Sequence, residues 1–267
     1  MLCQRGEIIQ RLQREVAAKR AIFCARCASG TGARYSEEGG ADLIVTYALA
    51  RWGQAGFNGA MGLAPFADGN ALAFEVGTRE ILPIVKDTPV LLGLACTDPT
   101  RRVDTWLPQI DAAGFSGINN WASVSMVDGN FRRVLESNGM GFDREVEFMR
   151  QAHAHGFFTL AYLFEPDQAR AMAEAGVDGI VCHLGVGGEM PSLEESPAIV
   201  TAIAEAAHAV SREIFILTHG GHIRTPEHAA WVAQRSPSVG YLGAADASPK
   251  IREAIVERAR EYKYALP

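Results

Sequence analysis

The feature that most constrains this fold is a recurring unit, in which a helical segment ends at a glycine and leads at once into an apolar strand. Three copies align closely, at residues 37–45, 111–119 and 173–181. The glycine in each copy suits the left-handed conformation that ends a helix, and the apolar residues after it suit a buried strand. Repeated alternation of strands and helices predicts a parallel sheet with right-handed crossovers.

The whole chain can be divided into eight strand-then-helix units. The expected strands are residues 21–25, 43–47, 90–96, 116–120, 158–164, 179–183, 214–219 and 239–243. With an extra helix before the first strand, from about Arg5 to Lys19, this predicts a single (β/α)8 TIM barrel over residues 1–267. A doubly wound open sheet is the alternative. The turn Ser29-Gly-Thr-Gly32 lacks the third glycine of a dinucleotide-binding turn, so no nucleotide cofactor is expected.

Composition excludes several classes of protein. The net charge of −6 argues against nucleic-acid binding, which needs a basic face. With 48% hydrophobic and 21% charged residues, the chain has the balance of a soluble enzyme with a large core. It shows neither an apolar run long enough for a membrane span nor a signal-peptide pattern at its start, so we expect no membrane association and a cytoplasmic location.

Cysteine usage points to reduced thiols, because the five cysteines are an odd number and three lie in apolar, strand-like runs. Cys24 and Cys27 have C-x-x-C spacing. With no second pair nearby, a redox or zinc role for them is the weaker reading. The four lysines, Lys19, Lys86, Lys250 and Lys263, avoid the strand ends, so a Schiff-base mechanism lacks its nucleophile.

Catalytic candidates stand at the carboxyl ends of the strands, which meet at one face of a barrel. His183 and His219 end the sixth and seventh strands, and Glu165 follows the fifth. As catalytic residues they would act in acid–base chemistry. The same three side chains also suit a divalent metal such as Mg²⁺ or Zn²⁺, with Asp98 suited to the harder ion. The alternatives are ordinary hydrogen bonding for the histidines and a first-turn helix charge for Glu165.

Polar and small residues at the same edge are candidates for substrate binding. Asn119, Asn120, Tyr162 and Asp98 are suited to a carbonyl or carboxylate, and glycine turns after strands seven and eight are suited to phosphate, namely Gly220, Gly221, Gly243 and Ala244. Internal hydrogen bonding and simple tight turns are the competing explanations. The other histidines are expected to be solvated or structural, with His222 the one exception.

Several motifs together resemble one family, the phosphoenolpyruvate-hydrolase-like TIM barrels, which are also described as similar to indole-glycerol-phosphate synthase. The motifs are Ala41-Asp-Leu-Ile, the loop Gly62–Asn70, Thr97-Asp-Pro99, Gly139-Met-Gly-Phe-Asp143, Thr218-His-Gly-Gly221 and Thr225-Pro-Glu227. The resemblance covers about Ala41 to Arg252. It implies an activity like that of phosphonopyruvate hydrolase, by analogy with the phosphoenolpyruvate mutase and isocitrate lyase barrels. The chain departs from those enzymes in lacking an acidic metal-binding cluster.

Two functions follow as hypotheses. The first is a hydrolase or lyase that cleaves a C–P or C–C bond in a small anionic 2-oxo acid, with or without the assistance of a metal ion. The second is a non-catalytic barrel that senses a metabolite or binds a protein. Two long excursions, Arg51–Asn70 and Trp121–Phe142, carry apolar residues that a barrel core does not need. They favour a homo-oligomer under either hypothesis.

Overall fold

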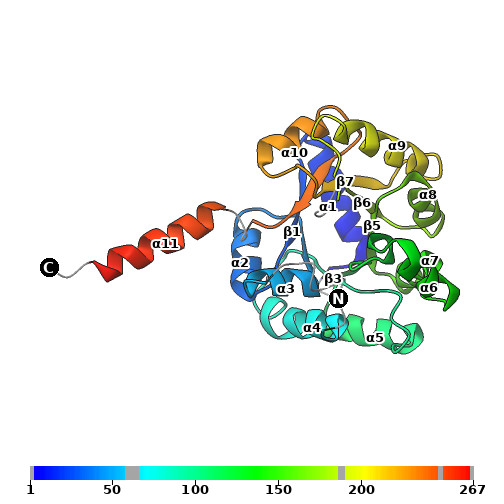
Figure 1. Ribbon diagram of the computed structural model, residues 1–267, viewed down its shortest axis with the longest axis horizontal. Helices are drawn as coiled ribbons and strands as arrows, with labels where there is room; N and C mark the ends of the chain where they lie inside the picture. The colour runs from blue at the N-terminus through cyan, green and yellow to red at the C-terminus, as the bar shows by residue number, and fades with distance from the viewer. Residues whose placement is uncertain (1–2, 58–65, 186–189, 246–248, 265–267) are drawn as a thin grey trace.

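The protein, seen here as a computed structural model, forms a closed barrel surrounded by helices (Figure 1). The structure describes residues 3–57, 66–185, 190–245 and 249–264. The strands are β1 (Ile22–Arg26), β2 (Leu43–Thr46), β3 (Val90–Gly93), β4 (Gly117–Asn119), β5 (Phe158–Leu163), β6 (Gly179–His183), β7 (Phe215–His219) and β8 (Gly240–Gly243). The helices are α1 (Arg5–Ala17), α2 (Gly30–Glu38), α3 (Ala48–Gln54), α4 (Gly69–Val76), α5 (Val103–Ala113), α6 (Gly129–Ser137), α7 (Phe142–His155), α8 (Pro166–Glu174), α9 (Ser196–His208), α10 (Pro226–Ala233) and α11 (Pro249–Lys263).

The strands pair in chain order, β1 to β8, all parallel, and β8 closes the barrel against β1. The predicted TIM barrel with an extra N-terminal helix is therefore confirmed, and the open-sheet alternative is wrong. The glycine stops predicted before strands two, four and six adopt positive φ at Gly40, Gly114 and Gly176. A side chain other than glycine rarely adopts that conformation, so these positions end their helices as the sequence indicates.

Alternation along each strand divides the core into two parts. On β2, Leu43 and Val45 belong to the cluster that fills the barrel, and Ile44 belongs to the cluster between the strands and the outer helices. All three side chains are fully buried. Because a parallel barrel strand is covered on both faces, it reads in the sequence as a continuous apolar run.

Helix α1 closes the amino-terminal end of the barrel. Its Ile8 and Leu12 are buried and pack with the residues that fill the barrel. The guanidinium of Arg5 on α1 pairs with the Asp178 carboxylate beside β6, with an N–O distance of 2.7 Å. A barrel closed by a helix at this end leaves its carboxyl-terminal end as the place for a site.

The two long connections, Arg51–Asn70 and Trp121–Phe142, contain helical segments. The second holds a short 3-10 turn at Val124–Met126 and helix α6, and the first holds α3 before it passes outside the described residues. Helix α11 projects away from the barrel (Figure 1). Within the parts of the chain that the structure describes, no helix is both long enough and apolar enough to cross a membrane.

Candidate active site

The site candidates meet inside the barrel at its carboxyl-terminal end. Val45, Leu160 and Val181 point into the barrel. Because side chains alternate along a strand, the residues two positions later also point inward, above these three. This top layer contains Tyr47, Tyr162 and His183, together with Arg26, Trp121 and His219 from the other strands and loops.

His219 is held as a neutral imidazole. Its Nδ1 lies 2.7 Å from the carbonyl oxygen of Leu242 on β8, and because a carbonyl only accepts, Nδ1 carries the proton and donates it. Nε2 is left with a lone pair. The surrounding protein desolvates the ring and, with a smaller contribution from the nearby Arg26 guanidinium, lowers the pKa of His219 to about 4. Nε2 is therefore unprotonated near neutral pH and can accept a proton.

His183 has the opposite tautomer. Its Nδ1 accepts the backbone N–H of Gly185 at 3.0 Å, so the proton of the neutral ring is on Nε2. The side chain is stacked between Trp121 and Phe164, with centroid distances of 5.0 and 4.7 Å. Burial, followed by repulsion from His219, moves the pKa of His183 well below its usual value. It therefore presents an uncharged N–H donor.

Four polar atoms in or directly below this layer are buried without a hydrogen-bond partner. Three are donors, namely His183 Nε2–H, Trp121 Nε1–H and the Tyr162 hydroxyl, which makes no geometrically good hydrogen bond with its neighbour Tyr47. The fourth is the acceptor Asn119 Oδ1, at the level of Leu160. The rings that carry the three donors are mutual neighbours, with centroids 4.7 to 5.6 Å apart. Buried polar groups are normally paired, so a cluster of unpaired donors indicates a place where a ligand supplies acceptors.

Arg26, the last residue of β1, adds positive charge to the same layer. Its guanidinium acts electrostatically on Tyr47, Tyr162, His219 and Tyr241. No carboxylate forms a salt bridge with it among residues 3–57, 66–185, 190–245 and 249–264. Sequence reasoning placed Arg26 and Tyr47 at the carboxyl ends of their strands without giving them a role, and it did not select Trp121.

Trp121 is positioned by a buried carboxylate on α7. Glu145 is fully buried and accepts the Asn120 side-chain N–H at 2.8 Å and the Val124 backbone N–H at 2.6 Å. These bonds hold the chain on both sides of Trp121. Burial raises the pKa of Glu145 to about 7, with the hydrogen bonds from Val124 and Asn120 opposing that rise.

Asn119, the last residue of β4, and Asn120, which follows it, have different roles. Asn120 uses its whole amide, since Nδ2 donates to Glu145 and to the Tyr162 carbonyl, and Oδ1 accepts the Tyr162 backbone N–H. The prediction that Asn120 binds substrate is therefore corrected, because both polar atoms of its side chain are already hydrogen-bonded to β5 and α7. Asn119 donates to the Leu160 carbonyl at 2.7 Å and keeps Oδ1 free. It remains a candidate, as does Tyr162.

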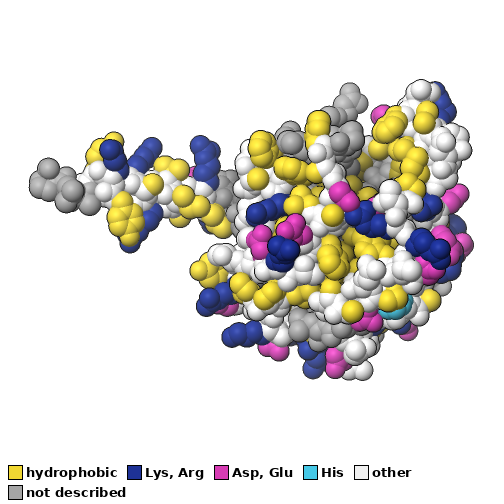
Figure 2. Space-filling view, turned by 90° about the horizontal axis from the view of Figure 1, so that it is seen from below, with side chains coloured by type: hydrophobic (Ala, Val, Ile, Leu, Met, Phe, Trp, Pro, Cys, Tyr) yellow, Lys and Arg dark blue, Asp and Glu magenta, His cyan; other side chains and the backbone are white. Residues whose placement is uncertain are grey.

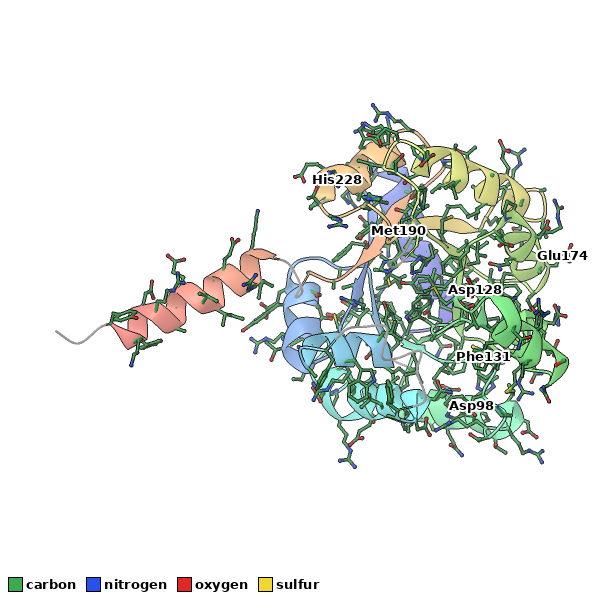
Figure 3. All side chains as sticks on the ribbon, viewed as in Figure 1. Asp98, Asp128, Phe131, Glu174, Met190 and His228 are labelled. Atoms are coloured by element: carbon green, nitrogen blue, oxygen red, sulfur yellow. The ribbon has the colours of Figure 1, made fainter. Side chains whose placement is uncertain are left out.

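Asp98 lies outside this layer. Figure 3 shows it beside α4 and α5, at the edge of the barrel. Its carboxylate pairs with Arg101 and accepts hydrogen bonds from the Asn70 amide and from the Thr100 N–H and hydroxyl. Every lone-pair direction of the carboxylate is thus in use. Asp98 stabilises the loop after β3, and its predicted roles in substrate and metal binding are corrected.

The predicted metal triad is not formed. Glu165 is the exposed residue just before α8, and it makes no contact with either histidine in the described structure. Over the described parts of the chain, no three His, Cys, Asp or Glu side chains gather closely enough to hold a metal ion. His183 Nε2 carries a proton, and a ligating nitrogen needs its lone pair. These residues therefore do not fit the divalent ion that the fold family implies.

The glycines after β7 serve close packing. Gly220 has φ +79°, and a Cβ there would lie 2.7 Å from the Gly185 carbonyl oxygen and 3.1 Å from the His183 ring. The N–H of Gly221 donates to that same carbonyl at 2.9 Å. The pair thus joins the loops after β6 and β7 and occupies the Gly221 N–H, and phosphate binding by these glycines stays a prediction. Gly243 likewise leaves room for the Tyr241 ring, and the rest of the turn beyond Ala245 lies outside the described residues.

The five cysteines are buried, and none of them forms a disulfide. Cys24 points into the barrel, and Cys27 lies on the outer side of the sheet, where its thiol is 3.6 Å from the Ser36 hydroxyl. Two cysteines on opposite faces of one strand do not form a shared redox or zinc site.

Comparison with known proteins identifies the family. A family model described as phosphoenolpyruvate hydrolase-like matches residues 7–264. The chain belongs to this family. It is 42% identical over 271 residues to two tomato (Solanum lycopersicum) proteins, ToMV susceptible protein tm-1(GCR26) and ToMV resistance protein Tm-1(GCR237). The match covers 98% of this chain but 36% of each tomato protein, so the chain spans about a third of their length.

Solved structures with a similar barrel fold extend the comparison. A phosphonopyruvate hydrolase matches with a TM-score of 0.63 at 16% identity, covering 97% of this chain and 91% of that one. An oxaloacetate acetylhydrolase matches with a TM-score of 0.64 at 14% identity, covering 99% and 89%. At such identities the likeness shows the shared barrel fold.

Proposed function

We propose that this barrel is a hydrolase or lyase that cleaves a C–P or C–C bond in a small anionic 2-oxo acid. The cluster of unpaired donors beside Arg26 carries the proposal. Three uncharged donors and the Arg26 cation, which forms no salt bridge with a carboxylate of the described residues, favour a ligand that is negatively charged and rich in oxygen acceptors. A 2-oxo acid supplies both a carboxylate and a carbonyl oxygen.

The two histidines divide the chemistry between them. For C–P cleavage, Arg26 holds the substrate carboxylate and His183 Nε2–H donates to the carbonyl oxygen. His219 Nε2 accepts a proton from the water that attacks phosphorus. The electron pair of the broken C–P bond moves into the carbonyl to form an enolate, which the His183 donor stabilises. Protonation of the enolate carbon then yields the 2-oxo acid and phosphate. Asn119 and Tyr162 complete the substrate contacts.

The test is turnover of phosphonopyruvate and phosphoenolpyruvate, followed by pyruvate release in a coupled assay, and of oxaloacetate, followed by release of oxalate and acetate. We expect one of these to turn over with the wild-type chain and His219→Gln to abolish that activity while the barrel stays folded. Equal activity in wild type and His219→Gln would overturn the assignment of the base. The same panel with and without added Mg²⁺ or Zn²⁺ tests whether a metal contributes through residues outside the described parts.

The second candidate is a barrel that binds an anion without turning it over. The lowered pKa values of His183 and His219 favour this reading, because both rings stay uncharged near neutral pH and are weak proton carriers there. A solved phosphonopyruvate hydrolase is described as a complex with oxalate and Mg²⁺. Oxalate binding by calorimetry, with no product from any of the three substrates, would favour the binding function.

A further inference from the structure

The unpaired oxygen of Asn119 differs from the three unpaired donors near it, because an amide oxygen only accepts hydrogen bonds. The Asn119 side chain is fully buried. Neither Trp121 Nε1–H nor the Tyr162 hydroxyl donates to its Oδ1, although both of these donors are themselves unpaired. Buried polar atoms are normally paired, so this oxygen indicates a place where a ligand supplies a donor.

The orientation of the Asn119 amide is fixed by the backbone of β5. Its Nδ2 donates to the Leu160 carbonyl at 2.7 Å, and Asn119 and Leu160 are direct partners in the register of β4 and β5. Turning the amide over would place Oδ1 against that carbonyl oxygen, and neither oxygen has a proton to donate. The unpaired atom of this side chain is therefore the acceptor.

Asn119 lies directly below the top layer of the barrel. Its register partner on β3 is Gly93, and the Tyr47 side chain packs there so closely that a Cβ at Gly93 would lie 2.8 Å from Tyr47 Cβ. On the other side, Tyr162 follows the register partner Leu160 by two residues on β5. Tyr47 and Tyr162 both belong to the top layer, so a ligand held by that layer meets Asn119 at its inner end.

A hydroxyl group on the ligand suits this acceptor better than an ammonium group does. The Arg26 guanidinium acts electrostatically on Tyr47 and Tyr162, the two rings above Asn119. In the part of the chain that the structure describes, Arg26 forms no salt bridge with a carboxylate. On the outer surface, by contrast, Figure 2 shows basic and acidic side chains side by side. The unneutralised charge of Arg26 repels a cationic group and tolerates a hydroxyl.

We propose that Asn119 selects 2-oxo acids that also carry a hydroxyl group, whose O–H donates to Asn119 Oδ1. The carboxylate and carbonyl of a plain 2-oxo acid only accept hydrogen bonds, so they pair with the donors and with Arg26 and leave Oδ1 unpaired. A hydroxyl on C3 or C4 supplies the missing donor. A site built to pair with a substrate hydroxyl discriminates strongly against the analogue that lacks it. The inference rests on the proposed function, because it specifies the ligand of that same site.

The first experiment compares 2-oxo acids with their hydroxylated forms by calorimetric titration of the wild-type chain. The pairs are pyruvate with 3-hydroxypyruvate, and 2-oxobutyrate with 4-hydroxy-2-oxobutyrate. We expect a hydroxylated acid to bind about 10–100-fold more tightly than its partner, the range that pairing one buried acceptor contributes. Equal affinity within both pairs would overturn the proposal.

The second experiment uses Asn119→Leu to separate recognition by Asn119 from recognition by another group. The variant should lose the preference for the hydroxylated acid. Asn138→Leu is the matched control and should keep the preference, because Asn138 is exposed and its amide likewise donates to a backbone carbonyl, that of Val134 at 2.8 Å. Circular dichroism melting shows whether each variant is folded. Asn119→Thr serves where the leucine variant is unfolded, since its hydroxyl keeps a donor for β5. A preference that persists in the folded Asn119 variant would overturn the proposal.

Oxalate distinguishes this inference from the proposed function, because oxalate has no hydroxyl group and reports on the donors and Arg26 alone. We expect the wild type and the folded Asn119 variant to bind oxalate with similar affinity. Oxalate binding without any hydroxyl preference would overturn the inference and leave the proposed function standing. If neither oxalate nor any of the 2-oxo acids binds, both are wrong.

Discussion

The rings of His183 and His219 lie 4.9 Å apart, centroid to centroid, and cross at 79°. The two residues are direct partners in the register of β6 and β7, so the sheet itself fixes their separation. In each ring Nδ1 is hydrogen-bonded to a backbone group, as a donor in His219 and as an acceptor in His183. The pair therefore keeps one donor and one base on the two Nε2 atoms.

Replacing His219 with Gln should reduce kcat on the preferred substrate about 10²–10⁴-fold, the range that general acid–base groups contribute. The cause is the loss of the Nε2 lone pair. Steady-state kinetics of the purified variant would measure this, with His155→Gln on α7 as the matched control. His155 lies against Asp111 and stacks on Phe157, remote from the top layer. A similar loss in both variants would point to a general folding defect.

Stability should fall as the pH drops from about 6.5 toward 4, partly because of His219. The pKa of this ring is about 4 in the folded chain and about 6.5 when unfolded, so within that window only the unfolded chain takes up the proton. The unfolded state gains up to about 3 kcal/mol at the acid end of this range. Urea unfolding at a series of pH values would measure the slope, and His219→Gln should flatten it. An unchanged slope in that variant would contradict the neutral assignment.

Arg26→Gln should weaken binding of oxalate about 10–100-fold, which corresponds to the loss of one charge-assisted contact. Calorimetric titration would measure the dissociation constant. Besides burial, the Arg26 guanidinium lowers the pKa of His219, so the same variant should raise that pKa in an NMR titration. Arg102→Gln is the control, because Arg102 is highly exposed and pairs only with Asp104 among the described residues. Equal oxalate affinity in the two variants would show that Arg26 does not bind the ligand.

Glu145→Gln should lower the free energy of unfolding by about 1–3 kcal/mol near pH 8, where the carboxylate is ionised, because a Gln Nε2 would face one of the two N–H donors that the carboxylate accepts. Chemical unfolding would measure the change. Glu147→Gln, on the exposed side of α7, should stay within about 0.5 kcal/mol of wild type. If the two variants unfold alike, Glu145 does not fix the segment that carries Trp121.

Metal analysis of the purified protein tests the conclusion that Glu165 does not form a metal site with His183 and His219. The double variant His183→Ala/His219→Ala should contain the same amount of divalent metal as the wild type, because the described residues bring no third ligand to the pair. Elemental analysis of both proteins after gel filtration gives the answer. Stoichiometric metal in the wild type that disappears in the variant would restore the predicted histidine metal site.

The sequence predicted the barrel well because apolar runs and helix-ending glycines are local signals. It also placed His183 and His219 together, since both end adjacent strands. It missed the choice between Asn119 and Asn120, which depends on which of two neighbouring side chains points into the barrel. It missed Trp121 because that residue follows a strand, and its position depends on a contact with Glu145 on another element. Such contacts between distant segments leave no local pattern.

The pairing of Arg5 with Asp178 has a consequence for how the chain folds. These residues are 173 positions apart, so α1 is made well before Asp178 and pairs with it only after the segment beside β6 has been synthesised. Contacts with such long sequence separation slow folding, because a large loop must close before they form. Until the barrel forms, the apolar side of α1 has no packing partner and stays exposed on the nascent chain.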